Sequence, residues 1–311
     1  MKAYTIFDDF PEDAKASLES AGFAVTVHPM GVPRPDHDRM KAIMREYDCV
    51  IIGTSQKITE DMFDGINSIR IIGTASVGTD HIKVPEAKKN LVHIYNAPKA
   101  NGQSVAEYTI ACALSCVKRL DEGRNLYMSG HDNKSLYKKP EDLLGKTMGV
   151  IGAGNISARI MDYARFFGMK VICWTRNPAA HSELAEKGTE FKSLEYIAEN
   201  ADVISVNLPN KPETKNIISA EFVAKMKPES IFISVSRIET LDLPALIAKA
   251  DSCPGFYVCL DLDVNPEVAK MADGRKKVFI TPHIASGTVE TRKRLFREAA
   301  TNVAKAVKNI I

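Results

Sequence analysis

The feature that most constrains the fold of this 311-residue chain is an alternation between two kinds of segment. Short, continuously apolar, β-branched runs such as Cys49–Ile52 and Val203–Val206 are separated by stretches with helical apolar spacing, such as Arg39–Tyr47 and Ala220–Met226. Strands that are apolar throughout are typical of a parallel sheet covered by helices on both faces. The pattern therefore predicts an α/β fold.

This alternation occurs twice along the chain. A first set of strands ends near Tyr95, one long helix is expected over Ser104–Met128, and the alternation restarts after the polar stretch Gly130–Asp142. A second α/β unit thus lies between an N-terminal unit and a C-terminal helix over Val289–Ile311. The periodicity leaves open whether that last helix returns to the first unit.

The composition excludes several classes of partner. Lys and Arg number 41 against 39 Asp and Glu, and this balance argues against nucleic acid or a membrane surface. No apolar run approaches the roughly 18 residues that a membrane span needs. The six cysteines lie mostly in apolar runs, and the histidines are scattered. We expect a cytoplasmic protein without disulfides or a metal site.

A glycine-rich turn follows the expected strand Met148–Ile151 and opens the expected helix Ile156–Phe167. Gly152 allows a tight turn, Gly154 lets the backbone approach a pyrophosphate, and Ser157 is a small residue where glycine or alanine is usual. The helix N-terminus adds free N–H groups for phosphate. A glycine pair that serves packing alone is the alternative. The cofactor-binding residues predicted here are Gly152, Gly154, Asn155 and Ile156.

The end of the next expected strand, Val171–Trp174, indicates which dinucleotide is bound. An acid there bonds the ribose 2′-hydroxyl of NAD, whereas an arginine accommodates the 2′-phosphate of NADP. Here the strand is followed by Thr175, Arg176 and Asn177. Arg176 is a delocalised cation suited to phosphate, so we predict NADP. NAD is the alternative, if Arg176 only stacks on the adenine.

Six motifs occur together in one order: the glycine-rich turn and residues 75–80 (ASVGTD), 101–107 (NGQSVAE), 207–214 (NLPNKPET), 233–237 (ISVSR) and 281–286 (TPHIAS). With them, the chain from about Cys49 onward resembles the D-isomer-specific 2-hydroxyacid dehydrogenase family, which includes glyoxylate/hydroxypyruvate reductases and phosphoglycerate dehydrogenase. The resemblance implies two doubly wound parallel-sheet domains and a homodimer. A Rossmann dinucleotide-binding domain of residues 98–281 would be inserted into a flavodoxin-like substrate domain of residues 1–97 and 282–311.

The resemblance implies that Arg237 and His283 are catalytic. Arg237 would hold the substrate carboxylate and polarise the 2-keto oxygen, because a guanidinium is always charged and makes paired bonds to carboxylates. His283 would protonate the keto oxygen as hydride arrives, since imidazole titrates near neutral pH. Both residues directly follow expected strands, and ligands bind at the carboxyl ends of parallel strands.

A carboxylate should bond the catalytic histidine. The family has Leu-Asp-Val-Phe, two variable residues and then Glu-Pro, whereas this chain has Glu and Pro exchanged within residues 260–267. Glu267 is the candidate that hydrogen-bonds His283 and stabilises its imidazolium. Glu267 as an exposed loop residue is the alternative, with Asp263 as the partner of His283. Asp261 would face the nicotinamide carboxamide.

The resemblance also assigns binding residues outside these segments. Backbone N–H groups of one loop would bind the substrate carboxylate, and an asparagine would lie beside the reacting carbon. The substrate-binding residues implied are Ser76, Val77, Gly78, Asn101 and Arg237, and two further cofactor-binding residues are Leu208 and Pro209.

The leading interpretation is an oxidoreductase that reduces a small 2-keto acid, such as glyoxylate or hydroxypyruvate, to the D-2-hydroxy acid with NADPH. Gly53 replaces the arginine that the family uses to bind a substrate phosphate, which counts against phosphoglycerate. Two alternatives stay open. One is an NAD-linked D-lactate-type or phosphonate-analogue dehydrogenase, and the other is a nucleotide-sensing, corepressor-like binding protein on the same fold.

Overall fold

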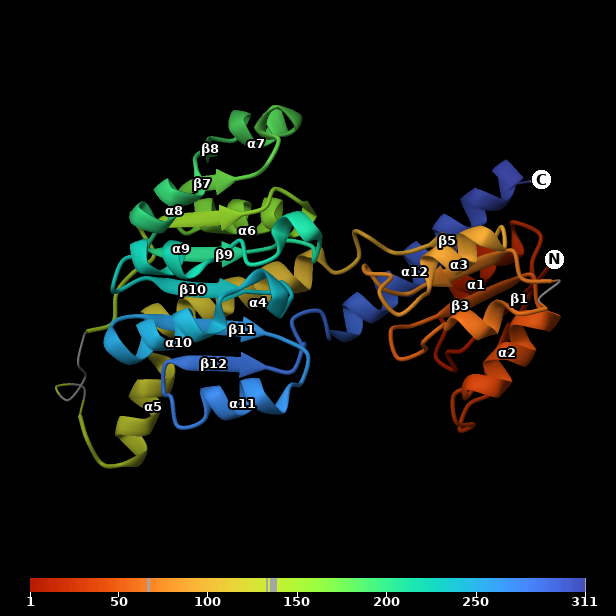
Figure 1. The fold of residues 1–311 in the computed structure, drawn as a ribbon, viewed down its shortest axis with the longest axis horizontal. Coiled ribbons are helices and arrows are strands. Elements are labelled where there is room, and N and C mark those ends of the chain that lie inside the picture. Colours follow the sequence, from red (N-terminus) through yellow and green to blue (C-terminus); the bar gives the residue numbers. More distant parts are fainter. Residues whose placement is uncertain (66–67, 133, 135–138, 311) are drawn as a thin grey trace. The chain divides into compact units, whose positions relative to one another are not determined.

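The computed structural model describes residues 1–65, 68–132, 134 and 139–310, so part of the polar stretch 130–142 lies outside the described residues. The chain divides into two compact units (Figure 1). The first unit comprises residues 1–101 and 288–311, and the second comprises residues 102–287. The sequence predicts domain boundaries after residues 97 and 281.

The first unit is built on a parallel sheet. Its strands are β1 (Lys2–Thr5), β2 (Ala24–Val27), β3 (Cys49–Ile52), β4 (Ile71–Thr74) and β5 (His93–Tyr95), in the order β2-β1-β3-β4-β5. This is the flavodoxin-like order. The helices are α1 (Glu12–Glu19), α2 (His37–Glu46), α3 (Val84–Lys89) and α12 (Val289–Ile310), with a 3-10 turn η1 (Glu60–Phe63). Every residue of β3 is buried, as expected for a central strand covered on both faces.

The C-terminal helix α12 belongs to this first unit. Phe296 of α12 packs against Phe7 and Phe10, with ring centroids 4.5 and 5.6 Å apart. Arg292 of the same helix makes a forked ion pair with Asp9 at 2.8 and 2.7 Å. The apolar contacts bury the helix face against the core, while the ion pair ties its outer side to the loop after β1.

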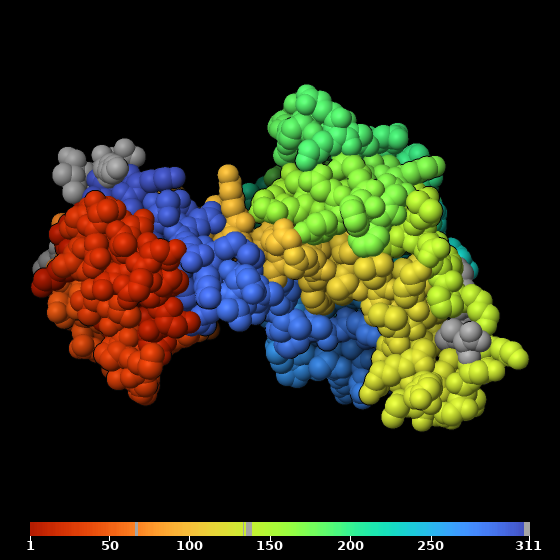
Figure 2. Space-filling model, turned by 180° about the vertical axis from the view of Figure 1, so that it is seen from behind, coloured from red at the N-terminus to blue at the C-terminus, as the bar shows by residue number. Residues whose placement is uncertain are grey.

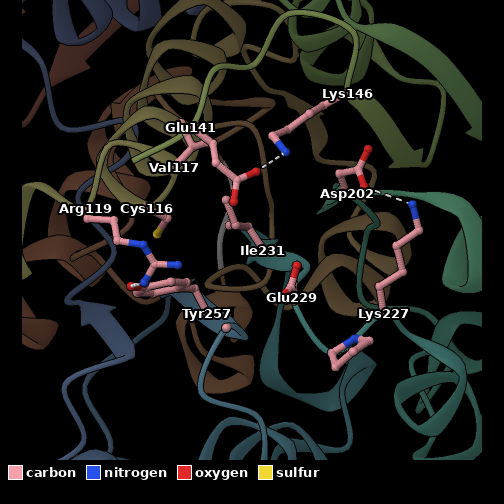
Figure 3. Close-up of a pocket in the computed structure, with 12 residues that line it drawn as sticks. Cys116, Val117, Arg119, Glu141, Lys146, Asp202, Lys227, Glu229, Ile231 and Tyr257 are labelled. Carbon is pink, nitrogen blue, oxygen red and sulfur yellow. Dashed lines mark hydrogen bonds and ion pairs between the residues drawn. The ribbon is translucent and has the colours of Figure 1, made fainter. Parts of the chain in front are cut away.

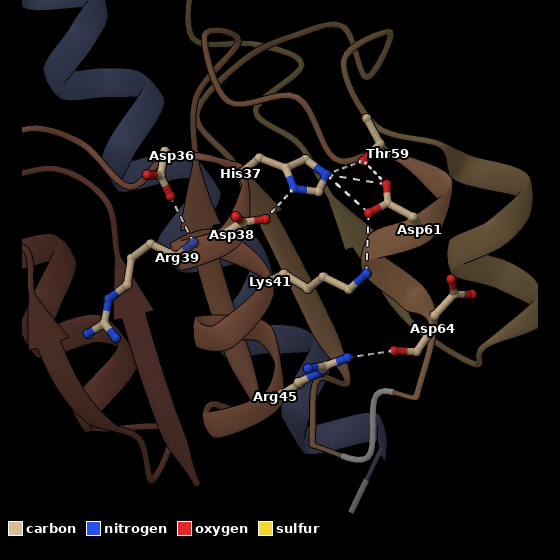
Figure 4. A network of polar contacts seen from close by, with 9 residues as sticks. All are labelled: Asp36, His37, Asp38, Arg39, Lys41, Arg45, Thr59, Asp61 and Asp64. Atoms are coloured by element: carbon tan, nitrogen blue, oxygen red, sulfur yellow. Dashed lines mark hydrogen bonds and ion pairs between the residues drawn. The ribbon is translucent and has the colours of Figure 1, made fainter.

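A polar network joins α2 to η1 on the surface of the first unit (Figure 4). His37 bonds Asp38 through Nδ1, and its Nε2 lies 3.2 Å from both Thr59 and Asp61. Hydrogen bonds to the two carboxylates raise the pKa of His37. The hydroxyl of Thr59 donates to Asp61, and together with Lys41 and His37 it lowers the pKa of Asp61 to about 2.

The second unit contains a larger parallel sheet in the order β12-β11-β10-β9-β6-β7-β8. The strands are β6 (Thr147–Ile151), β7 (Lys170–Trp174), β8 (Glu190–Phe191), β9 (Val203–Val206), β10 (Ile231–Ser234), β11 (Tyr257–Asp261) and β12 (Val278–Thr281). The strand order reverses between β6 and β9, as in a doubly wound Rossmann sheet. The α/β class with two parallel-sheet units, predicted from the sequence, is confirmed.

Helices cover both faces of this sheet. They are α4 (Gly102–Val117), α5 (Leu120–Met128), α6 (Asn155–Phe166), α7 (Ser182–Glu186), α8 (Leu194–Asn200), α9 (Ala220–Lys225), α10 (Leu243–Ser252) and α11 (Pro266–Ala272), with 3-10 turns η3 (Pro178–His181), η4 (Pro212–Thr214) and η5 (Ile238–Thr240). On one face, α4 lies between α6 and α5 (Figure 2). Exposed apolar side chains on these helices are Leu120, Tyr127, Met128 and Phe166.

The single helix expected over Ser104–Met128 is wrong, because the chain breaks between α4 and α5. Arg119 has a φ of 55°, and a left-handed residue cannot continue a right-handed helix. Its guanidinium is buried and donates to the hydroxyl of Tyr257 at 2.5 Å and to Glu122 at 3.2 Å. The expected helix is therefore two helices, with Lys118 and Arg119 between them.

Two expectations about the chain as a whole can be compared with the described residues. Across that part of the chain, we find no helix with the length and apolarity that crossing a membrane requires. All six cysteines are free thiols, and Cys49, Cys116, Cys173 and Cys259 are buried. The interpretation of the cysteines as core residues is therefore confirmed.

Candidate active site

The glycine-rich turn lies between β6 and α6. Gly152 has a φ of 107°, and a Cβ there would lie 2.7 Å from the carbonyl oxygen of Asn207. Ser157 is completely buried in the first turn of α6, which explains why a small residue is needed for helix-on-strand packing. A Cβ built on Gly154, the N-cap of α6, meets no atom within 4 Å. The space in front of the helix N-terminus is thus open, and this turn fits a dinucleotide pyrophosphate.

A second loop reaches the same place from β9, the neighbour of β6 at the point where the strand order reverses. Leu208 N–H donates to Ser236 Oγ at 2.8 Å, and Thr214 Oγ1 donates to the carbonyl oxygen of Pro209 at 2.6 Å. The side-chain oxygen of Asn207 is buried and has no hydrogen-bond partner among the described residues. Dinucleotides bind at this switch point in Rossmann sheets, and an orphaned buried acceptor there suits a bound ligand.

Arg176, in the loop after β7, forms an ion pair. Its Nη1 lies 2.8 Å from Oε1 of Glu213 in η4, and both side chains are about half exposed. Bonding to its own backbone N–H and to Arg176 lowers the pKa of Glu213. The sequence analysis missed Glu213, because the pairing joins loops that are separated along the chain and meet only at the sheet edge. Thr175 and Asn177 flank the arginine.

Three candidate catalytic side chains each follow one of three adjacent strands. Arg237 follows β10, Asp263 follows β11 and His283 follows β12. Nδ1 of His283 and Oδ1 of Asp263 are 2.7 Å apart. The hydrogen bond from His283, with a smaller contribution from the charge of Arg237, lowers the pKa of Asp263. Asp263 is therefore a carboxylate near neutral pH, and it fixes the proton of the imidazole on Nδ1, which leaves Nε2 for the substrate.

His283 was expected to bond Glu267, but in the structure it bonds a different carboxylate. Asn265 and Pro266 form a helix start: Asn265 is the N-cap of α11 and its Oδ1 accepts from the backbone N–H of Glu267 at 2.9 Å, with Pro266 at the first helical position. Glu267 is thus an exposed acid in the first turn of a helix. The partner of His283 is Asp263, the alternative named from the sequence.

Asp261, at the end of β11, was expected to face the nicotinamide carboxamide. Its side chain is 3% exposed, and its two oxygens accept from the hydroxyl of Thr281 and from the backbone N–H groups of Ile284 and Ala285. The carboxylate thus bonds the chain on either side of His283.

In the first unit, the loop Ser76–Gly78 follows β4 and is held by side chains. Ser76 Oγ donates to the carbonyl oxygen of Gly78 at 2.7 Å and therefore accepts from the hydroxyl of Thr74. Nε2 of His81 then donates to Thr74, and burial lowers the pKa of His81, which keeps the ring neutral. The carbonyl oxygens of Ser76 and Val77 accept from Ala97 N–H and Asn96 Nδ2. These bonds fix the path of the loop whose N–H groups the family resemblance assigns to the substrate carboxylate.

Asn101 lies at the end of the first unit. Its side-chain oxygen is buried, and in the described part of the chain it has no hydrogen-bond partner. A buried polar atom without a partner costs free energy unless a ligand or water completes it. Asn101 therefore keeps a place among the candidate binding residues.

A cavity of about 250 Å³ lies at the opposite, amino-terminal edge of the larger sheet (Figure 3). Within it, Lys146 pairs with Glu141 at 2.5 Å, and Lys227 pairs with Asp202 at 2.9 Å. Because these charges are matched by neighbours and the cavity contains no predicted site residue, we leave it out of the candidate site. No group of three or more metal-ligating side chains occurs among the residues that the structure describes.

Comparison with known proteins agrees with this geometry. Residues 110–285 match the family model of the D-isomer specific 2-hydroxyacid dehydrogenase NAD-binding domain. The chain is 31% identical to hydroxypyruvate reductase of Thermotoga maritima over 274 residues, covering 87% of this chain and 88% of that protein. It is also 31% identical to D-3-phosphoglycerate dehydrogenase of Bacillus subtilis, covering 86% of this chain but only 51% of that longer protein.

A solved structure shows the same fold over nearly the whole chain. D-lactate dehydrogenase from Aquifex aeolicus, in complex with NAD and lactic acid, superposes with a TM-score of 0.78 at 26% identity and covers 99% of this chain and 96% of that one. The chain belongs to the D-isomer-specific 2-hydroxyacid dehydrogenase family. The three relatives described above are named for three different substrates.

Proposed function

We propose that the chain reduces a small 2-keto acid, of the size of glyoxylate or hydroxypyruvate, to the D-2-hydroxy acid with NADPH. The observation that carries the proposal is the ordered trio at the carboxyl ends of β10, β11 and β12, in which His283 and Asp263 are 2.7 Å apart and Arg237 lies near enough to lower the pKa of Asp263. An imidazole oriented by a carboxylate and accompanied by a guanidinium suits proton transfer to a keto oxygen beside a carboxylate.

The chain's own groups divide the work of the reaction. The bound cofactor supplies the hydride that adds to the keto carbon. Arg237 holds the substrate carboxylate, and its guanidinium polarises the keto oxygen. A role for the N–H groups of Ser76–Gly78 in binding that carboxylate is what the family resemblance implies. Nε2 of the imidazolium of His283 gives its proton to that oxygen. Asp263 accepts from Nδ1 throughout and balances the positive charge before the transfer.

The preference for NADPH rests on Arg176, which follows β7 with no acid beside it in the loop. Glu213 favours the second candidate, an NAD-linked enzyme, because its carboxylate is 2.8 Å from Arg176 and pairs with the cation that a 2′-phosphate would need. We propose NADPH, since Glu213 is exposed on a 3-10 turn and a 2′-phosphate can displace it from the guanidinium.

We also propose a homodimer, from the family resemblance and from the exposed apolar side chains of α5 and α6. A cytoplasmic location is part of the same proposal.

Initial rates of NADPH and NADH oxidation with glyoxylate, hydroxypyruvate, pyruvate, phenylpyruvate and oxaloacetate test the function. We expect turnover of glyoxylate and hydroxypyruvate, with NADPH preferred. Equal or faster rates with NADH would overturn the cofactor assignment and leave the chemistry intact. Cofactor binding without turnover of any acid would overturn the proposed reaction.

A further inference from the structure

We infer that Tyr108, Thr281 and Asp261 form a chain of hydrogen bonds that positions His283, so that Asp261 acts on the reaction through this loop. The inference rests on the proposed function. It is carried by hydrogen bonds within the second unit and by the backbone conformation of His283.

His283 lies in a backbone conformation that needs support. Its φ is 52°, in the left-handed region that non-glycine side chains rarely adopt. Pro282 and His283 directly follow β12, which is the edge strand of the larger sheet. In the described sheet, a strand therefore lies beside this loop on the β11 side only. A residue kept in this region persists only where its surroundings determine it, and such residues cluster at functional sites.

Asp261 supplies that support from the neighbouring strand. Oδ1 accepts from the backbone N–H of Ile284 and Oδ2 from that of Ala285, both at 2.8 Å. These are the two peptide groups directly after His283, so one buried carboxylate fixes the path of the chain as it leaves the histidine. Hydrogen bonds from N–H groups to a buried carboxylate are stronger than those between neutral groups.

The orientation of Asp261 is set in turn by two hydroxyls. Thr281 is paired with Asp261 in the register of β12 on β11, and its Oγ1 donates to Oδ1 at 2.5 Å. Because that hydroxyl proton is used, Oγ1 of Thr281 accepts from the hydroxyl of Tyr108, which lies 2.7 Å away. Burial raises the pKa of Tyr108, so the phenol keeps its proton and remains a donor.

Helix α4 contacts the histidine loop at a second point. Ser104, one helical turn before Tyr108, donates to the carbonyl oxygen of Ala285 at 2.7 Å. The loop is therefore bonded from β11 on one side and from α4 on the other. This fixes His283 relative to Asp263, which follows Asp261 by two residues on the same strand end.

These contacts account for the burial of Asp261. The side chain is 3% exposed, and its two oxygens accept three hydrogen bonds from the loop and from Thr281. The role of Asp261 is thus that of a positioning residue.

The test removes one hydroxyl at a time and leaves the carboxylate in place. Thr281→Val keeps the shape of the side chain and loses the donor, Thr281→Ser keeps the donor, and Tyr108→Phe removes the outer hydroxyl. Tyr257→Phe is the matched control, because Tyr257 is a buried tyrosine at the other end of β11 and bonds Arg119. For each variant, kcat and KM for glyoxylate, the pH profile of kcat and the Kd for NADPH are measured.

We expect Thr281→Val to lower kcat about tenfold, because a hydrogen bond to a charged group is lost, and to change its pH profile, while the Kd for NADPH stays within about twofold. Thr281→Ser should restore kcat, Tyr108→Phe should lower it less, and Tyr257→Phe should leave it unchanged. Wild-type kcat and pH profile in Thr281→Val would overturn the inference. A weaker NADPH Kd with unchanged kcat would overturn it in favour of a cofactor contact.

Hydrogen exchange of the backbone amides separates this inference from the proposed function. If the wild-type chain reduces no keto acid, the function fails, but the loop can still be examined. The amides of Ile284 and Ala285 should exchange faster in Thr281→Val than in the wild type or in Thr281→Ser. Unchanged exchange at both amides would overturn the positioning chain whether or not a substrate is found.

Discussion

The pairing of His283 with Asp263 makes a prediction that separates the structure from the expectation drawn from the family pattern. Asp263→Asn keeps the size of the side chain and an oxygen that can accept from Nδ1, but it removes the negative charge. The imidazole and the carboxylate side chains are 37% and 76% exposed, so water screens part of their interaction. We therefore expect Asp263→Asn to lose about 1 kcal/mol of transition-state stabilisation, the upper end for exposed ion pairs. This corresponds to a roughly fivefold lower kcat.

Glu267→Gln is the matched control, since it removes one carboxylate from the same segment. Because Glu267 lies in the first turn of α11 and not at His283, we expect its kcat to equal that of the wild type. The assay is the initial rate of NADPH oxidation at saturating glyoxylate, followed from pH 5 to pH 9. A larger loss of kcat in Glu267→Gln than in Asp263→Asn would refute the assignment of Asp263.

The further predictions concern the cofactor site and stability. Arg176→Gln should lower kcat/KM with NADPH about tenfold and spare NADH, whereas Glu213→Gln should raise the preference for NADPH; the ratio of the two cofactors in initial rates tests both. The pKa of His37 is raised in the folded state, so the stability that its charge contributes is complete below about pH 6.5 and is lost as the pH rises through the folded-state pKa. The thermal unfolding midpoints of His37→Ala and the wild type should therefore converge at alkaline pH. Asp61, with its pKa lowered to about 2, should lose its contribution only as the pH falls below about 4. Gly152→Ala should destabilise the chain by about 1–3 kcal/mol, measured by urea unfolding, because φ is positive and the added Cβ meets a backbone oxygen at 2.7 Å.

Much of the fold follows from local sequence signals. Cys49–Ile52 and Val203–Val206 are strands with the predicted bounds, because a continuous β-branched run satisfies the burial of a central strand on its own. Gly168 ends α6, because it has a φ of 71° and its N–H bonds the carbonyl oxygen of Arg165. These elements depend on residues close together in the chain.

Two of the misses depend on contacts between distant residues. Arg119 breaks the expected helix because its guanidinium finds Tyr257, which is far away in sequence and adjacent only in the fold. Glu213 meets Arg176 for the same kind of reason. The third miss had a local signal. Asn265 followed by Pro266 is typical of a helix N-cap and first helical residue, but the family pattern led us to align Glu267 with the carboxylate that bonds His283.

The candidate site divides in the same way. The residue types at the strand ends, Arg237 and His283, could be selected from the sequence because chemistry collects at carboxyl ends of parallel strands. The carboxylate that bonds the imidazole could not be selected between Glu267 and Asp263, since both lie in the segment after β11 and the path of the chain decides which one faces the ring.

The central claim is that His283 delivers a proton to a 2-keto acid. The most direct measurement is the rate of NADPH oxidation with glyoxylate by the wild type and by His283→Gln, together with the Kd of each for NADPH. We predict that the variant loses about 10²- to 10⁴-fold in kcat, the usual contribution of a general acid, while its Kd for NADPH is unchanged. Equal rates in the two proteins would show that His283 is not the proton donor.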